Sequence, residues 1–229
     1  MPREPDTSIW LIIPAYNEAI AIGRVVTDVV RHGYNVAVID DGSTDETGRK
    51  AATAGATVIT HPINLGQGAA LQTGIQFTLR QGADCIVTFD ADEQHRSADI
   101  KGLIEALATH NADFALGSRF LGSAVAMPMS RRLLLIAAKW FTRLTTGLKI
   151  SDTHNGLRAM TRRGASRIKL RQNRMAHASE LLDQIARSGL RYVEVPVTIE
   201  YSRYSLAKGQ RLADSLRILV DLSAQRLHR

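Results

Sequence analysis

Short apolar runs alternate with longer amphipathic stretches through the first half of the chain. The apolar runs are rich in β-branched residues, which favour strands, whereas the stretches between them are helix-like. This alternation is typical of βαβ units and predicts an α/β fold with a mostly parallel sheet. The predicted strands are residues 9–14, 36–40, 57–60 and 85–90, and the predicted helices are residues 20–32, residues 66–81 and a helix opened by the capping-box pattern Ser43-Thr44-Asp45-Glu46.

The second half of the chain has a less regular pattern. The predicted elements are a strand at 113–118, helices at 131–146 and 179–188, and a strand at 192–199. Pro196 is expected to break that last strand, because proline cannot donate to a strand ladder. After Lys208-Gly209 a final amphipathic helix is expected to run towards Arg229, with Leu212, Leu216, Leu219, Val220, Ser223 and Leu227 on one side. The length suits a single domain over residues 1–229.

The composition excludes several classes of protein. Charged residues make up 22% of the chain, and no stretch approaches the ~20 uninterrupted apolar residues of a membrane span. The start of the chain lacks the pattern of a signal peptide, so a cytoplasmic location is expected. Cys85, the single cysteine, lies in an apolar run and is expected to be buried without chemistry.

The net charge of +7 predicts an anionic partner. Nucleic acid, a membrane surface and phosphorylated ligands would all satisfy this charge. The chain has no zinc-ligand spacing, and aromatic residues are only 5% of it, so nucleic acid is not expected.

Acidic residues recur just after the predicted strands, at Glu18, at Asp40-Asp41 and at Asp90 and Asp92. In open α/β sheets ligands bind outside the carboxyl ends of the strands, so these clusters point to one crevice. Two carboxylates separated by one residue can both turn toward a hard cation such as Mg²⁺ or Mn²⁺. The alternative is a solvated loop, where the Asp-x-Asp pattern is common.

Five motifs follow one another in a fixed order over residues 9–120. They are Pro14-Ala15-Tyr16-Asn17-Glu18, Asp40-Asp41-Gly42-Ser43-Thr44-Asp45, Asn64-Leu65-Gly66-Gln67-Gly68, Phe89-Asp90-Ala91-Asp92-Glu93-Gln94-His95 and Gly117-Ser118-Arg119-Phe120. Their order resembles family 2 of the inverting nucleotide-sugar glycosyltransferases. The resemblance implies the GT-A fold, a Rossmann-like sheet flanked by helices, with residues 1–120 binding a nucleotide-sugar and a metal.

The resemblance also implies roles for single residues in nucleotide binding. Glu18 would accept hydrogen bonds from the ribose hydroxyls, and Asp41 would accept one from a base N–H. Gly66 and Gly68 would let the backbone approach the ligand, although an ordinary tight turn before a helix explains them equally well. Asp40 is left out of this set, because an acidic residue that closes a strand can cap the next turn instead. The full nucleotide-binding set is Pro14, Tyr16, Glu18, Asp41, Gly66, Asp90 and Ala91.

Asp90 and Asp92 would then hold Mg²⁺ or Mn²⁺ against the diphosphate, with Gln94 completing the metal ligands. The next residues, His95-Arg96, depart from the His-Pro pair of the polyprenyl-phosphate branch of the family. His95 is expected to be structural rather than catalytic.

The second half, residues 121–229, is expected to bind the acceptor. The block from Asp152 to Arg158 resembles the Asp-x-x-Ser-Gly-Phe-Arg block of relatives of dolichyl-phosphate mannosyltransferase, with Asn155 in the serine position. It implies a polyprenyl-phosphate acceptor whose phosphate Arg158 would clamp. Asp152 is a candidate general base, which matters for a hydroxyl acceptor but little for a phosphate that is already ionised. The further phosphate or acceptor ligands are Arg119, Arg131, Arg203 and Lys208, of which the last two could instead be solvated loop charges.

Residues 131–146 predict a basic amphipathic helix. Arg131, Arg132, Lys139 and Arg143 share one side of it, and Leu133, Ile136, Ala137, Trp140, Phe141 and Leu144 share the other. Such a helix can lie in the interface of an anionic membrane, or it can pack its apolar side on the core of the protein. Both interpretations stay open at this point.

The sequence therefore predicts a metal-dependent, inverting glycosyltransferase of the hexosyltransferase type, peripheral on the inner face of the plasma membrane. The donor would be a nucleoside-diphosphate sugar, with uridine the first choice and guanosine the second, and the acceptor a polyprenyl phosphate. The alternatives are an enzyme acting on a hydroxyl of a saccharide or lipid-linked glycan, and an inactive nucleotide-sugar-binding partner subunit. The last helix could pack within the chain or form a homo-oligomer.

Overall fold

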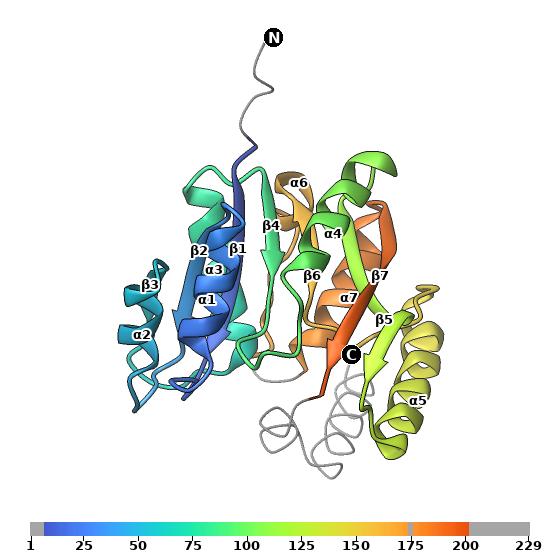
Figure 1. Ribbon diagram of the computed structural model, residues 1–229. Helices are drawn as coiled ribbons and strands as arrows, with labels where there is room; N and C mark the ends of the chain where they lie inside the picture. Colours follow the sequence, from blue (N-terminus) through green and yellow to red (C-terminus); the bar gives the residue numbers. More distant parts are fainter. Residues whose placement is uncertain (1–6, 174–175, 202–229) are drawn as a thin grey trace.

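A seven-stranded sheet runs through the part of the chain that the computed structural model describes, residues 7–173 and 176–201 (Figure 1). The strand order is β3-β2-β1-β4-β6-β5-β7. The strands are β1 (Ile9–Ala15), β2 (Asn35–Asp40), β3 (Thr57–Thr60), β4 (Cys85–Thr88), β5 (Phe114–Val125), β6 (Arg158–Thr161) and β7 (Tyr192–Glu200). The helices are α1 (Ile22–Arg31), α2 (Thr47–Thr53), α3 (Gln67–Arg80), α4 (Ala98–Thr109), α5 (Met129–Thr146), α6 (Arg162–Ala165) and α7 (His177–Ser188).

The first four strands are parallel to one another, as the alternating pattern predicted. Strand β6 is antiparallel to both of its neighbours, β4 and β5, and β5 is parallel to β7. Strand β6 and helix α4 were not predicted. The strand has four residues, and it begins with a buried arginine, Arg158, so it lacks an apolar run that could have revealed it.

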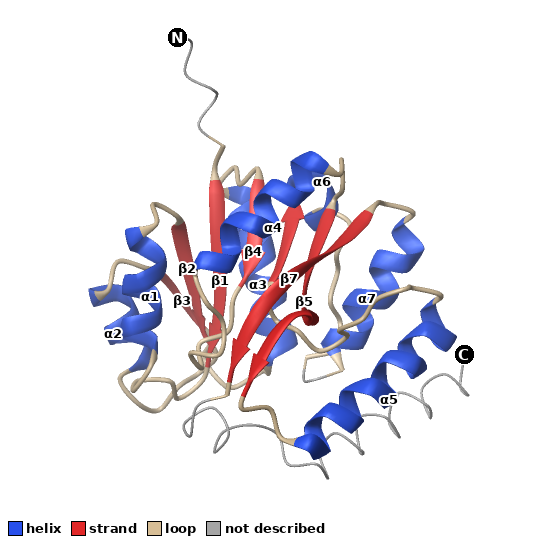
Figure 2. Cartoon of the chain, turned by 45° about the vertical axis from the view of Figure 1, so that its right-hand side comes forward, coloured by secondary structure: helices blue, strands red, loops and turns tan. Residues whose placement is uncertain are grey.

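Two apolar cores cover the two faces of the sheet. Successive residues of β1 point to opposite faces, so Leu11 and Ile13 lie in one core and Ile12 lies in the other. Helices α1 and α4 cover the first face, and α3 and α7 cover the second (Figure 2). Gly74 lets α3 approach β1 closely, because a Cβ there would lie 2.3 Å from Cγ2 of Ile12.

Cys85 is buried in β4, as expected from its apolar surroundings. Burial raises the pKa of its thiol to about 12, so the thiol is protonated at neutral pH.

Two local predictions were wrong. Helix α2 begins at Thr47 without a capping box, because Ser43 accepts a hydrogen bond from the backbone N–H of Asn17 instead (3.0 Å). Strand β7 continues through Pro196, although its pairing with β5 shifts register directly after this residue, between Ser118 and Ser123 of β5. It lies at the edge of the sheet, where a proline costs no ladder hydrogen bond if its nitrogen faces outward.

Helix α5 exposes most of its large apolar side chains. Its buried residues are Leu135, Ala138 and Thr142. By contrast Leu133, Trp140 and Leu144 are 63%, 54% and 84% exposed, so this side of the helix does not pack on the described core. Within the described residues, no helix is both long enough and apolar enough to cross a membrane. Arg203, Lys208 and the predicted final helix lie outside the described residues.

Candidate active site

A cavity of about 400 Å³ opens where β1, β2 and β4 end, as the strand-end clusters predicted. It brings together most of the predicted site residues. Those that line it are Pro14, Tyr16, Glu18, Asp41, Gly66, Asp90, Ala91, Asp92, Gln94, Arg119 and Arg158. Further lining residues for which the sequence suggested no ligand role include Gln67, His154 and His177. Residues from both predicted halves of the chain therefore meet in one cavity.

Asp41 lies at the end of this cavity formed by the loops after β2 and β3. Its Oδ1 accepts from Nδ1 of His61 at 2.7 Å and from the backbone N–H of Leu65 at 3.0 Å. Its Oδ2 accepts from the backbone N–H of Gly66 at 2.7 Å. A carboxylate has about four acceptor positions, so these three contacts leave one of them on Oδ2.

The glycines of this loop serve the fold directly. Gly66 precedes α3 with φ of 104°, a conformation that glycine adopts without strain. At Gly68 a Cβ would lie 2.0 Å from the carbonyl oxygen of Gln172, so this residue permits close packing of the chain on itself. Asp40 accepts from the backbone N–H of Ser43 (3.0 Å) and so caps the turn, the alternative that the sequence left open.

The acidic pair Asp90 and Asp92 lines the same cavity. Oδ2 of Asp90 pairs with Nε2 of His95 at 2.9 Å, and its Oδ1 accepts from the side chain of Gln67 at 3.2 Å. Burial alone would raise the pKa of Asp90, but the His95 hydrogen bond and the nearby Arg158 lower it. The pKa of Asp92 is raised to about 6, first by burial and then by the charge of Asp90. Two acidic groups thus lie close together with opposite pKa shifts.

These residues fit a divalent cation. The described residues contain no cluster of three His, Cys, Asp or Glu side chains placed to hold a metal. However, Mg²⁺ is usually bound through one or two carboxylates together with waters and substrate phosphates. Asp90, Asp92 and Gln94 supply this kind of oxygen-rich set, and the raised pKa of Asp92 shows that its negative charge is poorly compensated by the protein.

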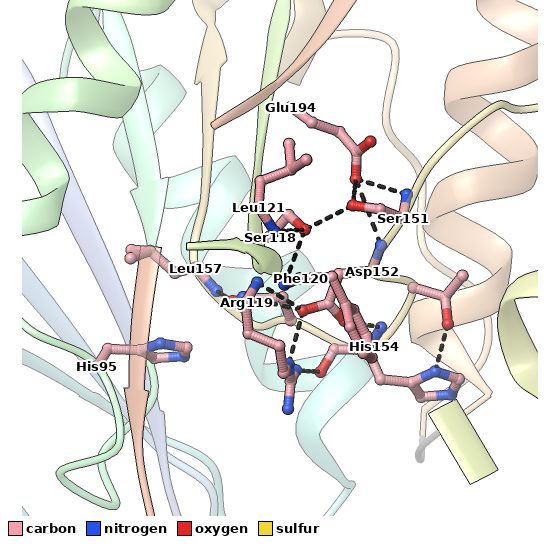
Figure 3. A network of polar contacts seen from close by, with 12 residues as sticks. His95, Ser118, Arg119, Phe120, Leu121, Ser151, Asp152, His154, Leu157 and Glu194 are labelled. Carbon is pink, nitrogen blue, oxygen red and sulfur yellow. Dashed lines mark hydrogen bonds and ion pairs between the residues drawn. The ribbon is translucent and has the colours of Figure 1, made fainter. Parts of the chain in front are cut away.

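Arg119, which lines the cavity, belongs to a buried network of polar contacts (Figure 3). Nε of Arg119 donates to Oδ2 of Asp152 at 2.6 Å, and the two side chains are only 3% and 0% exposed. The guanidinium also donates to the hydroxyl of Tyr201 at 2.5 Å and to the carbonyl oxygen of His154 at 2.7 Å. Arg119 is therefore held rigidly where it lines the cavity.

Asp152 does not line the cavity, in contrast to what a general base requires. In addition to its ion pair with the side chain of Arg119, the carboxylate of Asp152 accepts three hydrogen bonds. The donors are the backbone N–H groups of Arg119 and His154 and the side chain of Asn155. Three of these four donors contact Oδ2, and Oδ1 accepts only from the N–H of His154 at 3.3 Å. In this geometry Asp152 is the buried ion-pair partner of Arg119, and its role as a general base stays a prediction.

Glu194 holds the loop that carries Asp152. Its Oε1 accepts from the backbone N–H and hydroxyl of Ser151 (2.7 and 2.8 Å) and from the backbone N–H of Asp152 (3.3 Å) (Figure 3). The hydroxyl of Ser151 also lies 2.6 Å from that of Ser118. Neither Glu194 nor Tyr201 was predicted as a site residue. A carboxylate in the middle of the apolar strand β7 is the signal that could have indicated the former.

Arg158 lies in β6 and connects the two parts of the cavity. Burial lowers the pKa of its guanidinium to about 10, although the charges of Asp90 and Asp152 oppose that shift. The group stays cationic at neutral pH between the acidic pair and the arginine network. Arg131 lies in α5, and Arg203 and Lys208 lie outside the described residues, so their predicted contacts stay predictions.

The fold is an α/β sheet with a cavity outside the carboxyl ends of its parallel strands, the place where enzymes of this class bind their ligands. Residues 10–168 match the family described as glycosyl transferase family 2, and the chain belongs to this family. The chain is 31% identical over 239 residues to UDP-N-acetylglucosamine--dolichyl-phosphate N-acetylglucosaminyltransferase from Methanococcus voltae, covering 95% of each chain. It is 33% identical over 204 residues to undecaprenyl-phosphate mannosyltransferase from Micrococcus luteus, covering 83% of this chain and 82% of that protein.

A solved structure supports the fold independently. Glucosyl-3-phosphoglycerate synthase from Mycobacterium tuberculosis, crystallised with Mn²⁺, UDP-glucose and phosphoglyceric acid, superposes with a TM-score of 0.75 at 20% identity. The match covers 96% of this chain and 79% of that one. The predicted GT-A fold and the similarity to the polyprenyl-phosphate branch of the family are confirmed, and the chain is a glycosyltransferase.

Proposed function

We propose that this chain transfers a sugar from a nucleoside-diphosphate sugar to a polyprenyl phosphate at the cytoplasmic face of the membrane. The observation that carries the proposal is the arrangement of charge in one cavity. The acidic pair Asp90 and Asp92 and the cationic Arg119 and Arg158 line the same cavity, with Arg158 near enough to Asp90 to lower its pKa. Such a cavity can hold a metal-bound diphosphate and a second phosphate at the same time.

The donor would occupy the part of the cavity between Asp41 and Asp92. Pro14, Tyr16 and Glu18 line it beside Asp41, where they can contact the nucleoside. A UDP-sugar is the first choice and a GDP-sugar the second. The UDP-glucose complex of the glucosyl-3-phosphoglycerate synthase and the UDP-N-acetylglucosamine in the name of the Methanococcus voltae relative support that order.

Asp90, Asp92 and Gln94 would hold Mg²⁺ or Mn²⁺ against the diphosphate. When bound, the cation supplies a positive charge that offsets the negative charge growing on the leaving nucleoside diphosphate. His95 fixes the carboxylate of Asp90 through their hydrogen bond. The Mn²⁺ in the synthase structure supports a divalent ion here.

The acceptor phosphate would bind to Arg119 and Arg158. Arginine is suited to this role because its planar guanidinium binds phosphate oxygens in a bidentate manner. The dolichyl-phosphate and undecaprenyl-phosphate in the names of two relatives support a lipid phosphate. A hydroxyl acceptor would need a general base, and the predicted candidate Asp152 is enclosed in its ion pair, which favours the phosphate.

The reaction would be a single displacement with inversion. An oxygen of the lipid phosphate forms a bond to the anomeric carbon while the bond from that carbon to the diphosphate oxygen breaks. The bonding electrons leave with the nucleoside diphosphate. The phosphate is already ionised at neutral pH, so no side chain has to remove a proton. The residues of this chain orient the two phosphates and keep their charges apart.

Helix α5 would place the enzyme on the membrane that contains its acceptor. Its exposed apolar residues include Leu133, Trp140 and Leu144. Lys139 and Arg143 lie 5.9 and 5.7 Å from the ring of Trp140, so cations border the apolar surface. This combination suits the interface of an anionic bilayer, where apolar side chains enter the acyl region and cations remain with the headgroups.

The proposal is tested by incubating the protein with a panel of nucleoside-diphosphate sugars, Mn²⁺ and three matched acceptors. The acceptors are a polyprenyl phosphate, the corresponding polyprenol and a free saccharide, and products are identified by mass spectrometry. A glycosylated lipid phosphate is the expected product. Product on the polyprenol or saccharide alone would support the hydroxyl alternative. Tight nucleotide binding without any product would support the inactive binding subunit.

A further inference from the structure

A buried histidine lies directly behind Asp41 and is not needed for any step described above. His61 follows β3, and its side chain is 9% exposed. Its Nδ1 lies 2.7 Å from Oδ1 of Asp41, and its Nε2 lies 3.0 Å from Oγ1 of Thr73 on α3. The three side chains form a chain of hydrogen bonds from α3 to the wall of the cavity.

The chemistry of the partners fixes the direction of these hydrogen bonds. An ionised carboxylate only accepts, so Nδ1 of His61 must carry a proton and donate it to Asp41. In the neutral ring, Nε2 is then the acceptor, and the hydroxyl of Thr73 donates to it. One tautomer of His61 is thereby selected.

The backbone around His61 holds this arrangement in place. The N–H of His61 donates to the carbonyl oxygen of Asp40 at 2.9 Å. Gly42 has φ of 72°, and a Cβ there would lie 2.5 Å from the carbonyl carbon of Ile63. The loop after His61 therefore lies directly against the turn after Asp41. Donors from His61 and from the backbone of Leu65 and Gly66 both contact the carboxylate of Asp41.

We propose that His61 is a positioning residue that sets the base selectivity of the nucleotide site. By holding Oδ1 of Asp41, together with the N–H of Leu65, His61 turns the remaining acceptor position of Oδ2 toward the cavity. A base with an N–H at the matching position is then bound, and a base that presents an acceptor there is rejected. This inference rests on the proposed function, because it needs a nucleotide in the cavity.

Two substitutions separate this role from simple packing. In His61→Asn the side-chain amide nitrogen can take the place of Nδ1 and still donate to Asp41. In His61→Gln the amide reaches the position of Nε2, so contact with Thr73 is kept while the donor to Asp41 is lost. His110→Gln is the matched control, because His110 is exposed at the end of α4.

The experiment measures Kd for UDP, GDP, CDP and ADP by calorimetry with Mn²⁺, and melting temperatures confirm that each variant folds. We expect the wild type to prefer one base. His61→Gln should weaken that nucleotide about tenfold and the others by less than about twofold, as expected for a lost hydrogen bond to a charged group. His61→Asn should stay within about threefold of the wild type, and His110→Gln should be unchanged.

Three results would overturn the inference. Unchanged selectivity in a folded His61→Gln variant would show that Asp41 needs no support. Equal losses in His61→Asn and His61→Gln would show that only packing matters. Equal affinity of the wild type for all four nucleotides would show that Asp41 does not select the base. If the wild type binds no nucleoside diphosphate at all, the proposed function falls as well, so the two failures are distinguishable.

Discussion

Asp92→Asn should stabilise the metal-free protein although it removes a functional side chain. The pKa of Asp92 is about 6 in the folded chain against 3.8 for a free aspartate. The charged form is therefore disfavoured by folding. The stability that the folded chain has with Asp92 protonated is therefore fully present below pH 3.8 and is lost as the pH rises through about 6.

The size of the effect follows from the shift. The pKa of Asp92 is raised by about 2, and each pKa unit is worth about 1.36 kcal/mol, so the charged carboxylate lowers the free energy of unfolding by about 3 kcal/mol at pH 7.5. Asp92 is partly exposed, so solvent screening reduces this to about 1–2 kcal/mol. For a chain of this size we expect the melting temperature to rise by about 3–6 °C.

The assay is thermal unfolding in EDTA at pH 7.5 and pH 4.5, followed by the same scans with Mn²⁺. The gain should be largest at pH 7.5 and fall to about one third at pH 4.5, because the folded wild-type carboxyl is protonated there while the unfolded one is still mostly ionised. Mn²⁺ should raise the melting temperature of the wild type but not that of Asp92→Asn. Glu93→Gln is the control, because it removes a neighbouring carboxylate that pairs with Arg24 at the surface. An equal gain at both pH values, or none, would refute the reasoning.

Three further predictions concern other parts of the structure. Asp152→Asn should destabilise the protein by about 3 kcal/mol in urea unfolding, because it leaves Arg119 buried without its counter-charge. The same variant should raise KM for the acceptor without changing the pH profile of kcat. Pairing with Arg163 lowers the pKa of Asp113, so the ionised Asp113 stabilises the folded chain and this stabilisation is lost as the pH falls. Arg163→Gln should therefore make the free energy of unfolding less dependent on pH below about pH 4. Unfolding measured over an acid titration checks this. Trp140→Ser should reduce sedimentation with anionic liposomes several-fold and leave nucleotide affinity unchanged.

The parts of the fold that could be predicted are those encoded by local patterns. The parallel strands of the first half are apolar runs, so their positions followed from the sequence. Asp41, Asp90 and Asp92 follow such strands, and in a parallel sheet the carboxyl ends of neighbouring strands lie at one edge. Their presence in one cavity therefore followed as well.

The parts that could not be predicted depend on partners distant in the chain. Asp152 had the position of a possible base, but its pairing with Arg119 is decided by packing between segments 33 residues apart. Tyr201 contacts Arg119 across 82 residues and belongs to no motif. Helical spacing placed Leu133 on an apolar side of α5, but spacing alone does not show whether that side meets the core or remains exposed.

The central claim is that one cavity joins a metal-bound nucleotide-sugar to a lipid phosphate. Release of nucleoside diphosphate, measured with and without Mn²⁺ and with and without polyprenyl phosphate, tests it most directly. We predict rapid release only when both are present, a loss of at least about 100-fold in Asp92→Asn, and near wild-type release in Glu93→Gln. Equal release without the lipid phosphate, or full release by Asp92→Asn, would contradict the account.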